Sequence, residues 1–411
     1  MNSSHILKFS WRYFRAKKST NAINIISWVS MLAMFFGTAS LLVVLSAFNG
    51  FETLVQSLYG SFYPDIKVSA SQGKTIQIRA EQLQAMRSIS GIATISLVAE
   101  EKALLQNADM QTIVTIKGVD TAYAQVNNVP AFLYRGTFEL GTPEQPGLVM
   151  GVGIEQALGL LSDRTIFPVS VYFPKKGVPD LSDPNGSLAV GNAQPTGSFA
   201  IQSEFDNKYV LTNLDFLRTY AGYGSNEYTA LELKLYPHAD LASITTLLKE
   251  QLGSAYTVED RFQQNRTLYT TMQLEKLAVY AILTLILAVA AFNMVGALSM
   301  LVMEKRRDIQ VLKAMGATDQ MIQKIFLSQG LLLSLLGAGC GVLISLLLYY
   351  LQVTYKIVPL QGTTFLIDYY PIQLRWMDFM WVAAIVVVIA VLASWIPARS
   401  AAASIIDLRN Q

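Results

Sequence analysis

Four long stretches of the sequence contain no charged residue, and they constrain the fold more than any other feature. No Asp, Glu, Lys or Arg occurs in 19–51, 277–303, 325–355 or 379–398. A helix needs about 20 predominantly apolar residues to cross a bilayer, and each stretch reaches that length. Only 15% of the chain is charged, whereas about a quarter is usual for a soluble protein. The sequence therefore predicts an integral membrane protein with four transmembrane helices.

The remaining charges predict how the chain is threaded through the membrane. Residues 1–22 carry five Lys or Arg and no acid, and 304–324 carries five against three acids. Residues 50–275 instead carry 16 Lys or Arg against 23 Asp or Glu. Short basic flanks stay in the cytoplasm, so both termini are expected inside and the large acidic segment outside. A cleaved signal peptide is disfavoured because the first apolar stretch is too long.

These expectations divide the chain into membrane, inner and outer segments. From the N-terminus they are a cytoplasmic amphipathic helix (1–22), the first span (23–48), a periplasmic domain (49–275), the second span (277–303), a cytoplasmic loop with a short helix (304–324), the third span (325–352), a short periplasmic loop (353–378), the fourth span (379–398) and a cytoplasmic tail (399–411).

The segment between the first two spans alternates strand-like and helix-like runs. Met110–Lys117 alternates with period two, as a half-buried strand does, and Asp240–Leu252 is typical of a helix. We therefore expect a large extracytoplasmic α+β domain. The helical pattern of the first span continues to Tyr59, and Gln263–Lys276 leads into the second span without proline or glycine. Both helices are expected to rise above the membrane.

Motifs for catalysis are weak in this sequence. Gly73-Lys74-Thr75 resembles the end of a phosphate-binding loop, but the glycine required five residues earlier is Val68. The two histidines lie far apart without a zinc motif. Cys340 is the only cysteine, so an intrachain disulfide is excluded. We expect a chain that is not an enzyme and binds no metal or cofactor of its own.

The most informative segment is 304–319, which lies between the second and third spans. Ile309, Leu312 and Met315 recur every three residues, the apolar stripe of a short helix. Gly316 suits the end of that helix, and Thr318 suits the start of the next. An ordinary basic loop would explain the Lys and Arg residues but not this stripe.

This segment strongly resembles the coupling loop of the FtsX-like ABC transporter permeases, which include the MacB type. The resemblance implies a MacB-like periplasmic domain between the first two spans. It also implies a separate ATPase, in two copies, that binds ATP and Mg²⁺ and receives the coupling helix. The residues assigned to that contact are Glu304, Lys305, Arg306, Arg307, Asp308, Ile309, Leu312, Met315, Gly316 and Ala317.

A narrower resemblance is carried by Asn49-Gly50-Phe51-Glu52 and by Leu148–Leu160. Both are similar to stretches of the LolC/LolE permeases of the lipoprotein-releasing system. The implied partners are a second permease, identical or paralogous, a lipoprotein substrate in the inner membrane, a periplasmic carrier and the phospholipid bilayer. A face of the first span would meet acyl chains, although simple lipid-facing packing explains it equally well: Met31, Met34, Phe35, Phe48, Phe51 and Leu54.

Two other functions fit the same topology. A MacB-like exporter would carry its ATPase on the same chain, and none is present in this sequence. An FtsX-like signal transmitter to a wall hydrolase would have a much smaller outer domain. Release of lipoproteins is therefore favoured. Asn24 and Asn293 lie in or near the spans, where each is expected to bond a neighbouring helix.

Overall fold

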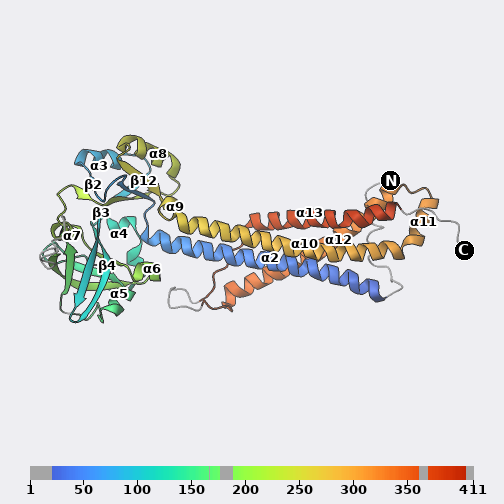
Figure 1. Cartoon of the computed structure of the whole chain (residues 1–411), viewed down its shortest axis with the longest axis horizontal. Helices are drawn as coiled ribbons and strands as arrows, with labels where there is room; N and C mark the ends of the chain where they lie inside the picture. The colour runs from blue at the N-terminus through green and yellow to red at the C-terminus, as the bar shows by residue number, and fades with distance from the viewer. Residues whose placement is uncertain (1–20, 166, 176–187, 361–368, 404–411) are drawn as a thin grey trace, which may run out of the picture. The chain divides into compact units, whose positions relative to one another are not determined.

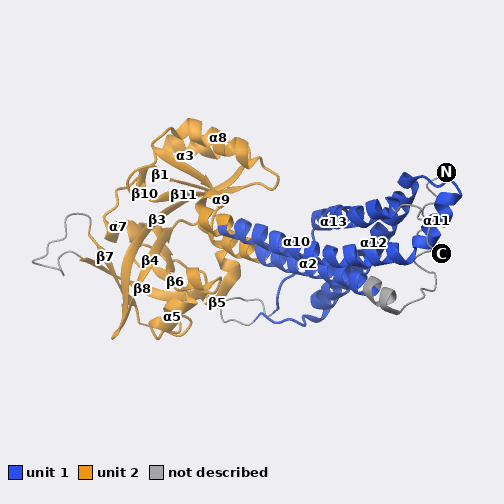
Figure 2. Ribbon diagram, turned by 45° about the vertical axis from the view of Figure 1, so that its right-hand side comes forward, with its two compact units in different colours: residues 1–53, 271–360, 369–411 blue, residues 54–270, 361–368 orange. Residues whose placement is uncertain are grey.

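The computed structural model describes residues 21–165, 167–175, 188–360 and 369–403, which divide into two compact units. Unit 1 comprises residues 1–53, 271–360 and 369–411, and unit 2 comprises 54–270 and 361–368 (Figure 2). The amphipathic helix predicted for 1–22 falls almost wholly outside the described residues. The same is true of the tail from residue 404.

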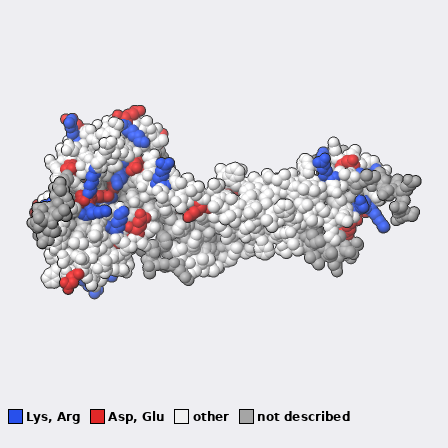
Figure 3. All heavy atoms as spheres, in the orientation of Figure 1, with Lys and Arg blue, Asp and Glu red and all other residues white. Residues whose placement is uncertain are grey.

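Unit 1 is built from long apolar helices. Among the described residues, four helices are long and apolar enough to cross a membrane. They are α2 (Asn21–Phe62), α10 (Arg266–Glu304), α12 (Asp319–Tyr355) and α13 (Trp376–Ala402), with the short α11 (Arg306–Ala314) between α10 and α12 (Figure 1). The middle of this unit shows no Lys, Arg, Asp or Glu on the visible face, and charges gather near α11 (Figure 3).

Two of these helices extend well beyond their charge-free stretches. The helix predicted to continue to Tyr59 is confirmed, since α2 ends at Phe62. The continuous run predicted for Gln263–Lys276 is wrong at its start. Asp260 and Gln263 form a capping box around the separate one-turn helix α9 (Arg261–Gln264), and the chain leaves helical geometry at Asn265 before α10 begins.

Glycines let α12 approach α2 closely. A Cβ added at Gly337 would lie 2.6 Å from the Met31 carbonyl oxygen, and one at Gly341 would lie 2.7 Å from that of Phe35. Apolar side chains give helices little preference for each other over lipid, so close backbone approach at small residues is a main source of their attraction. The spacing of four residues places both glycines on one face of α12.

Unit 2 contains a ten-stranded mixed sheet in its described residues, with order β12-β1-β11-β3-β4-β9-β6-β8-β5 and β7 paired with both β3 and β8. The pairs β4–β9 and β6–β8 are parallel. The strands are β1 (Ile66–Ala70), β3 (Ile92–Asn107), β4 (Met110–Val119), β5 (Leu133–Gly136), β6 (Gly147–Gly151), β7 (Val169–Pro174), β8 (Leu188–Phe199), β9 (Tyr209–Asn213), β11 (Ala230–Leu235) and β12 (Tyr256–Asp260), with β2 (Ile76–Gln77) and β10 (Glu227–Tyr228) forming a separate pair.

Short helices complete the core of unit 2. They are α3 (Ala80–Arg87), α4 (Tyr123–Val126), η1 (Val129–Phe132), α5 (Val152–Ala157), α6 (Ser203–Asp206), α7 (Leu214–Ala221) and α8 (Leu241–Leu252). Met86 of α3, Leu217 of α7 and Leu248 of α8 are buried with apolar side chains of the sheet in one cluster. The expected α+β character of this segment is confirmed.

The end of α2 that belongs to unit 2 is held by the one-turn helix α6. Phe62 stacks on Phe205 at a centroid distance of 4.6 Å, and the Tyr59 hydroxyl donates to Glu204 Oε2 over 2.5 Å. The turn is closed by Asp206, whose Oδ1 accepts from the Ile201 N–H over 2.9 Å. Burial raises the pKa of Asp206 to about 6, against the opposing effect of the hydrogen bonds from the Ile201 and Gln202 backbone.

The glycine contacts predict that two alanine substitutions on α12 will change the stability of the protein in different ways. Gly341→Ala should destabilise the protein by about 1–3 kcal/mol, because the added methyl meets the α2 backbone and cannot be accommodated without a shift. Gly339→Ala, two residues away, meets nothing within 4 Å and should be neutral or slightly stabilising, since alanine favours helix more than glycine does. Thermal unfolding in detergent measures both, and equal losses would contradict the close approach.

The raised pKa of Asp206 predicts a pH-dependent stability. The carboxyl binds its proton more tightly when folded, so its contribution to stability is present below about pH 4 and is lost as the pH rises through about 6. Asp206→Asn should therefore raise the melting temperature of the full chain at pH 7.5 and raise it less at pH 5. A difference that does not change with pH would show that burial of the charge is not responsible.

Candidate functional site

Helix α11 lies between α10 and α12, and its boundaries are set by the capping residues that the sequence predicts. α10 ends at Glu304, and α11 begins at Arg306 after Lys305. Gly316 has a φ of 90°, a conformation that favours glycine. The Thr318 side chain then accepts from the Met321 N–H and starts α12. The predicted helix end at Gly316 and helix start at Thr318 are confirmed, so a short helix is presented at one end of unit 1.

The apolar stripe of α11 does not form one surface. Ile309 is 1% exposed and packs with residues of α10, α12 and α13, including Leu301, Ile322 and Ala398. Met315 is 80% exposed, and Leu312 is half-buried. The expectation that the three residues are available together is therefore corrected for Ile309, because the bundle's own core covers it.

The exposed apolar surface of α11 consists of two large residues, Val311 and Met315, and not of the predicted three-residue stripe. Val311 is 58% exposed and lies four residues before Met315, so the two share a face of the helix. Val311 was not among the residues assigned from sequence, although its spacing from Met315 was visible there. A solvent-facing Val and Met on a strongly charged short helix form a small surface suited to another protein.

Charged side chains of α11 tie it to neighbouring segments. Lys313 Nζ donates to the Ala402 carbonyl oxygen over 2.8 Å and lies 3.0 Å from Asp319 Oδ1. Lys305 Nζ lies 3.1 Å from Asp308 Oδ2. Arg306 and Arg307 are exposed, whereas Glu304 and Ala317 are half-buried. The helix is thus anchored to α13 and to the start of α12, with both arginines facing outward.

The residues predicted to form an acyl-chain face on α2 also do not share one exposed surface. Met34 is buried in the bundle with Leu41 and Leu287, and Leu54 is buried as well. Neither can belong to an open face, because other parts of the chain cover them. Met31, Phe35, Phe48 and Phe51 are half-buried. A row of exposed residues instead recurs every four positions along this helix: Trp28, Leu32, Phe36, Ser40 and Val44.

An apolar cavity of about 450 Å³ lies beside α2 in unit 1. Val43 and Ala47 of α2 line it together with Leu348 of α12 and Ile372. The cavity wall is fixed by Gln352, which donates to the Val358 and Tyr370 carbonyl oxygens over 3.1 and 3.0 Å. Its apolar lining suits a hydrocarbon chain rather than a polar ligand.

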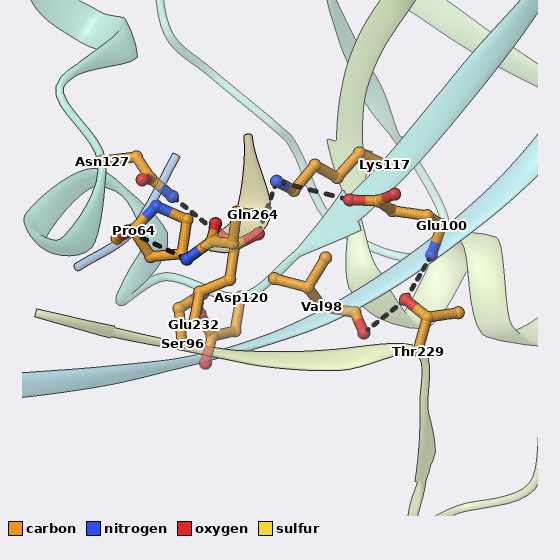
Figure 4. A network of polar contacts seen from close by, with 10 residues as sticks. All are labelled: Pro64, Ser96, Val98, Glu100, Lys117, Asp120, Asn127, Thr229, Glu232 and Gln264. Atoms are coloured by element: carbon orange, nitrogen blue, oxygen red, sulfur yellow. Dashed lines mark hydrogen bonds and ion pairs between the residues drawn. The ribbon is translucent and has the colours of Figure 1, made fainter. Parts of the chain in front are cut away.

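A buried charge network organises the sheet of unit 2. Lys117 of β4 is 2% exposed, and its Nζ lies 2.6 Å from Glu232 Oε1 and 3.5 Å from Glu100 Oε1 (Figure 4). Asn127 Nδ2 donates to Glu232 Oε2 over 2.5 Å. Burial alone would lower the pKa of Lys117, but Glu232 and Glu100 raise it well above its ordinary value. The ammonium group therefore stays charged inside the domain.

This network reaches the end of α2. The Lys117 ammonium group lies 4.9 Å from the centre of the Phe62 ring and 5.1 Å from that of Tyr123. A cation over an aromatic face is attracted to it, more strongly when both are desolvated. The arrangement positions the tip of a long helix and has no feature that points to a reaction.

The residues Gly73-Lys74-Thr75 do not form a phosphate-binding loop. The segment runs into strand β2 rather than into a helix whose N-terminus could receive a phosphate. Lys74 pairs with Glu101, and the Thr75 hydroxyl donates to Glu227 over 2.7 Å. Within the described residues, no three His, Cys, Asp or Glu side chains are grouped to hold a metal ion.

The sequence is similar to several known proteins. Residues 280–404 match the model of the family described as FtsX-like permease C-terminal. The lipoprotein-releasing system transmembrane protein LolC of Neisseria meningitidis is 28% identical over 403 residues, which cover 95% of each chain. LolE of Haemophilus influenzae is 25% identical over 415 residues and 96% of each chain.

The similarity of this chain to solved structures is weaker. The periplasmic region of MacB from Actinobacillus actinomycetemcomitans aligns with 53% of this chain and 98% of its own, at 12% identity and a TM-score of 0.36. The relatives of near-complete coverage bear the same two names to which Asn49-Gly50-Phe51-Glu52 pointed. Residues 280–404 thus match the FtsX-like permease C-terminal model, and the chain as a whole is similar to the lipoprotein-releasing system transmembrane proteins LolC and LolE.

Proposed function

We propose that this chain is the permease subunit that releases lipoproteins from the inner membrane, driven by a separate ATPase. The observation that best supports this proposal is α11, a short charged helix with an exposed Val311 and Met315. It lies between two helices that are long enough to cross a membrane. The similarity to LolC and LolE over 95% of the chain supports the substrate class. ATP and Mg²⁺ belong to the ATPase in this proposal.

The side chains of unit 1 support its insertion in a bilayer. Trp376 and Trp381 are exposed at one end of α13, and Trp395 is exposed towards the other. Tryptophan favours the membrane–water interface, where its ring and N–H are both accommodated. In this proposal the basic α11 end faces the cytoplasm, in line with the positive-inside rule, with both termini inside and unit 2 in the periplasm.

The anchoring of α11 gives the proposed mechanism its physical basis. Ile309 is locked into the core of the bundle, and Lys313 is bonded to the end of α13. A movement of the ATPase that shifts α11 must therefore shift α10, α12 and α13 with it, because a packed core moves as a body and does not deform gradually. Energy released by ATP hydrolysis would enter the chain at this helix.

The substrate side of the proposal rests on α2. Leu32, Phe36 and Val44 form an exposed apolar stripe, and the 450 Å³ cavity opens beside the outer half of the same helix. Burying apolar surface is worth about 25 cal/mol per Å², which suits the acyl chains of a lipoprotein leaving the bilayer. A periplasmic carrier would then receive the lipoprotein from unit 2.

The exposed pair on α11 generates a direct test of ATPase coupling. Val311→Asp and Met315→Asp should each abolish co-purification of the ATPase and leave lipoproteins in the inner membrane, because a carboxylate would be buried unpaired in an apolar contact. The protein level in the membrane should not fall, since neither residue is buried within the chain.

Gln320→Asp is the matched control for this test. Gln320 is exposed in the first turn of α12 and receives the same charge at a position outside the pair. It should retain both the ATPase and lipoprotein release. Normal ATPase binding and release in the Val311 and Met315 variants would disprove the coupling role of α11.

Asn293 supports a second permease in the complex. Met303, at the inner end of the charge-free stretch, is ten residues away, so Asn293 lies about 15 Å inside a hydrocarbon layer about 30 Å thick. Its side chain is exposed, and no hydrogen bond joins it to another described residue. A Cβ added at Gly296, one turn away, would meet nothing within 4 Å. An amide at the midplane favours a partner helix that bonds it.

A photoreactive amino acid at position 293 should therefore capture a permease chain in membranes that contain the complete complex. Position 388 on α13 is the control, because Val388 is also exposed and lies ten residues from the inner end of its own stretch, Ala398. The mass of the adduct distinguishes an identical from a paralogous permease. Equal capture at both positions, or none at 293, would contradict the assignment.

A further inference from the structure

Three of the charge-free stretches end at residues that meet in space. Glu52 follows the first stretch, Lys276 precedes the second, and Asp378 precedes the fourth. In the structure they lie on α2, α10 and α13 and join one polar cluster in unit 1. The residues that limit the apolar stretches in the sequence are therefore one site in the fold.

The centre of this cluster is Asn49. Its side chain is fully buried, and its Nδ2 donates to Asp378 Oδ2 over 2.5 Å. Its Oδ1 accepts from Lys276 Nζ over 2.9 Å. The Tyr280 hydroxyl donates to the other oxygen of Asp378 over 2.7 Å. One amide side chain thus joins α2 to both α10 and α13 through charge-assisted hydrogen bonds, the stronger class.

Glu52 forms an outer layer around this centre. Its Oε2 lies 3.2 Å from Lys276 Nζ and 3.1 Å from Arg375 Nη1. These side chains are 21%, 22% and 37% exposed, respectively, whereas Asp378 is buried. Two carboxylates balance two cations in the whole cluster. Partly exposed ion pairs contribute little to stability, so the outer layer is the part of the cluster that separates at the lowest cost.

The two residues between Asn49 and Glu52 contact the segment before α13. A Cβ at Gly50 would lie 2.2 Å from the Pro371 carbonyl oxygen, so only glycine permits this approach. Phe51 stacks with Tyr370 at a centroid distance of 6.4 Å. The Gln373 N–H donates to the Ser46 carbonyl oxygen over 2.9 Å. Each residue of Asn49-Gly50-Phe51-Glu52 therefore contributes to the same junction.

The junction lies where two helices leave the bundle. α2 passes from unit 1 to unit 2 after Thr53, and α10 enters unit 1 at Thr271. Asn49 and Glu52 are thus within the last turn of α2 in unit 1, and Lys276 is in the second turn of α10 in that unit. Contacts at this position decide whether the ends of α2, α10 and α13 move together or apart.

We propose that Asn49, Glu52, Lys276, Arg375 and Asp378 form a clasp that must open during each transport cycle. Closed, the clasp holds the outer end of α2 against α10 and α13. Open, it frees the part of α2 that carries Phe48 and the cavity residues Val43 and Ala47. This inference rests on the proposed function for its cycle, and on the contacts of unit 1 for its residues.

A reversible lock tests the clasp. The Thr53 hydroxyl donates to Gln373 Oε1 across the junction, and both residues are exposed. Thr53→Cys and Gln373→Cys, combined with Cys340→Ser, can be joined by a short reducible bis-methanethiosulfonate linker in the complex with its ATPase. Joining should abolish lipoprotein release, reduction should restore it, and the ATPase should remain bound. Release at the unlinked rate from the joined protein would overturn the clasp.

Two controls separate the clasp from the proposed function. The single variant Thr53→Cys with Cys340→Ser takes up the reagent without being joined, and it should release lipoproteins normally. If the unmodified chain releases none, the proposed function fails, and the clasp is tested by the rate of joining alone. That rate should fall when the ATPase is trapped with ATP and vanadate. An unchanged rate would overturn the clasp whatever the substrate.

Discussion

The exclusion of charge from the helix interiors is the constraint on which the rest of the structure depends. A charged side chain at the centre of a bilayer is costly, which accounts for Asp, Glu, Lys and Arg lying only outside the four charge-free stretches of unit 1. Many of these charged residues gather at two junctions, one around α11 and one around Asn49. The same physical rule that makes the spans visible in the sequence therefore creates the sites at which the helices are tied.

The sequence indicates helices in unit 1 well, because their signal is local. Charge-free length, the cap at Thr318 and the positive φ at Gly316 each depend on a few adjacent residues. The burial of single side chains depends on neighbours far along the chain. Ile309 and Met315 have the same spacing from Leu312, yet one faces the bundle core and the other faces outward. Periodicity identified the helix but could not say which part of its apolar stripe the bundle covers.

In unit 2 the strand predicted at Met110–Lys117 and the helix predicted at Asp240–Leu252 are confirmed as β4 and α8, but the long-range pairing of the sheet was not predicted. Its longest strand, β3, was not predicted, since the second half of Ile92–Asn107 is rich in Ala, Glu, Lys and Leu, which favour helix. Its buried positions also depart from strict alternation, because the strand pairs with β11, β4 and β7 in turn. Tertiary pairing overrides local preference at such a strand. The charge network of Lys117 could likewise not be predicted from the sequence, because its partner Glu232 is 115 residues away.

The two junctions differ in how deeply their contacts are buried. At the junction around α11, the helix is held by the buried Ile309 and by a hydrogen bond from the Lys313 ammonium group to the Ala402 carbonyl oxygen, so a displacement of α11 must carry the bundle. At the junction around Asn49 the ion pairs of Glu52 are partly exposed, although they surround the buried Asn49 and Asp378. In the proposed cycle, a force that enters through α11 would separate the partly exposed ion pairs of Glu52 before it disturbs the buried contacts of Ile309.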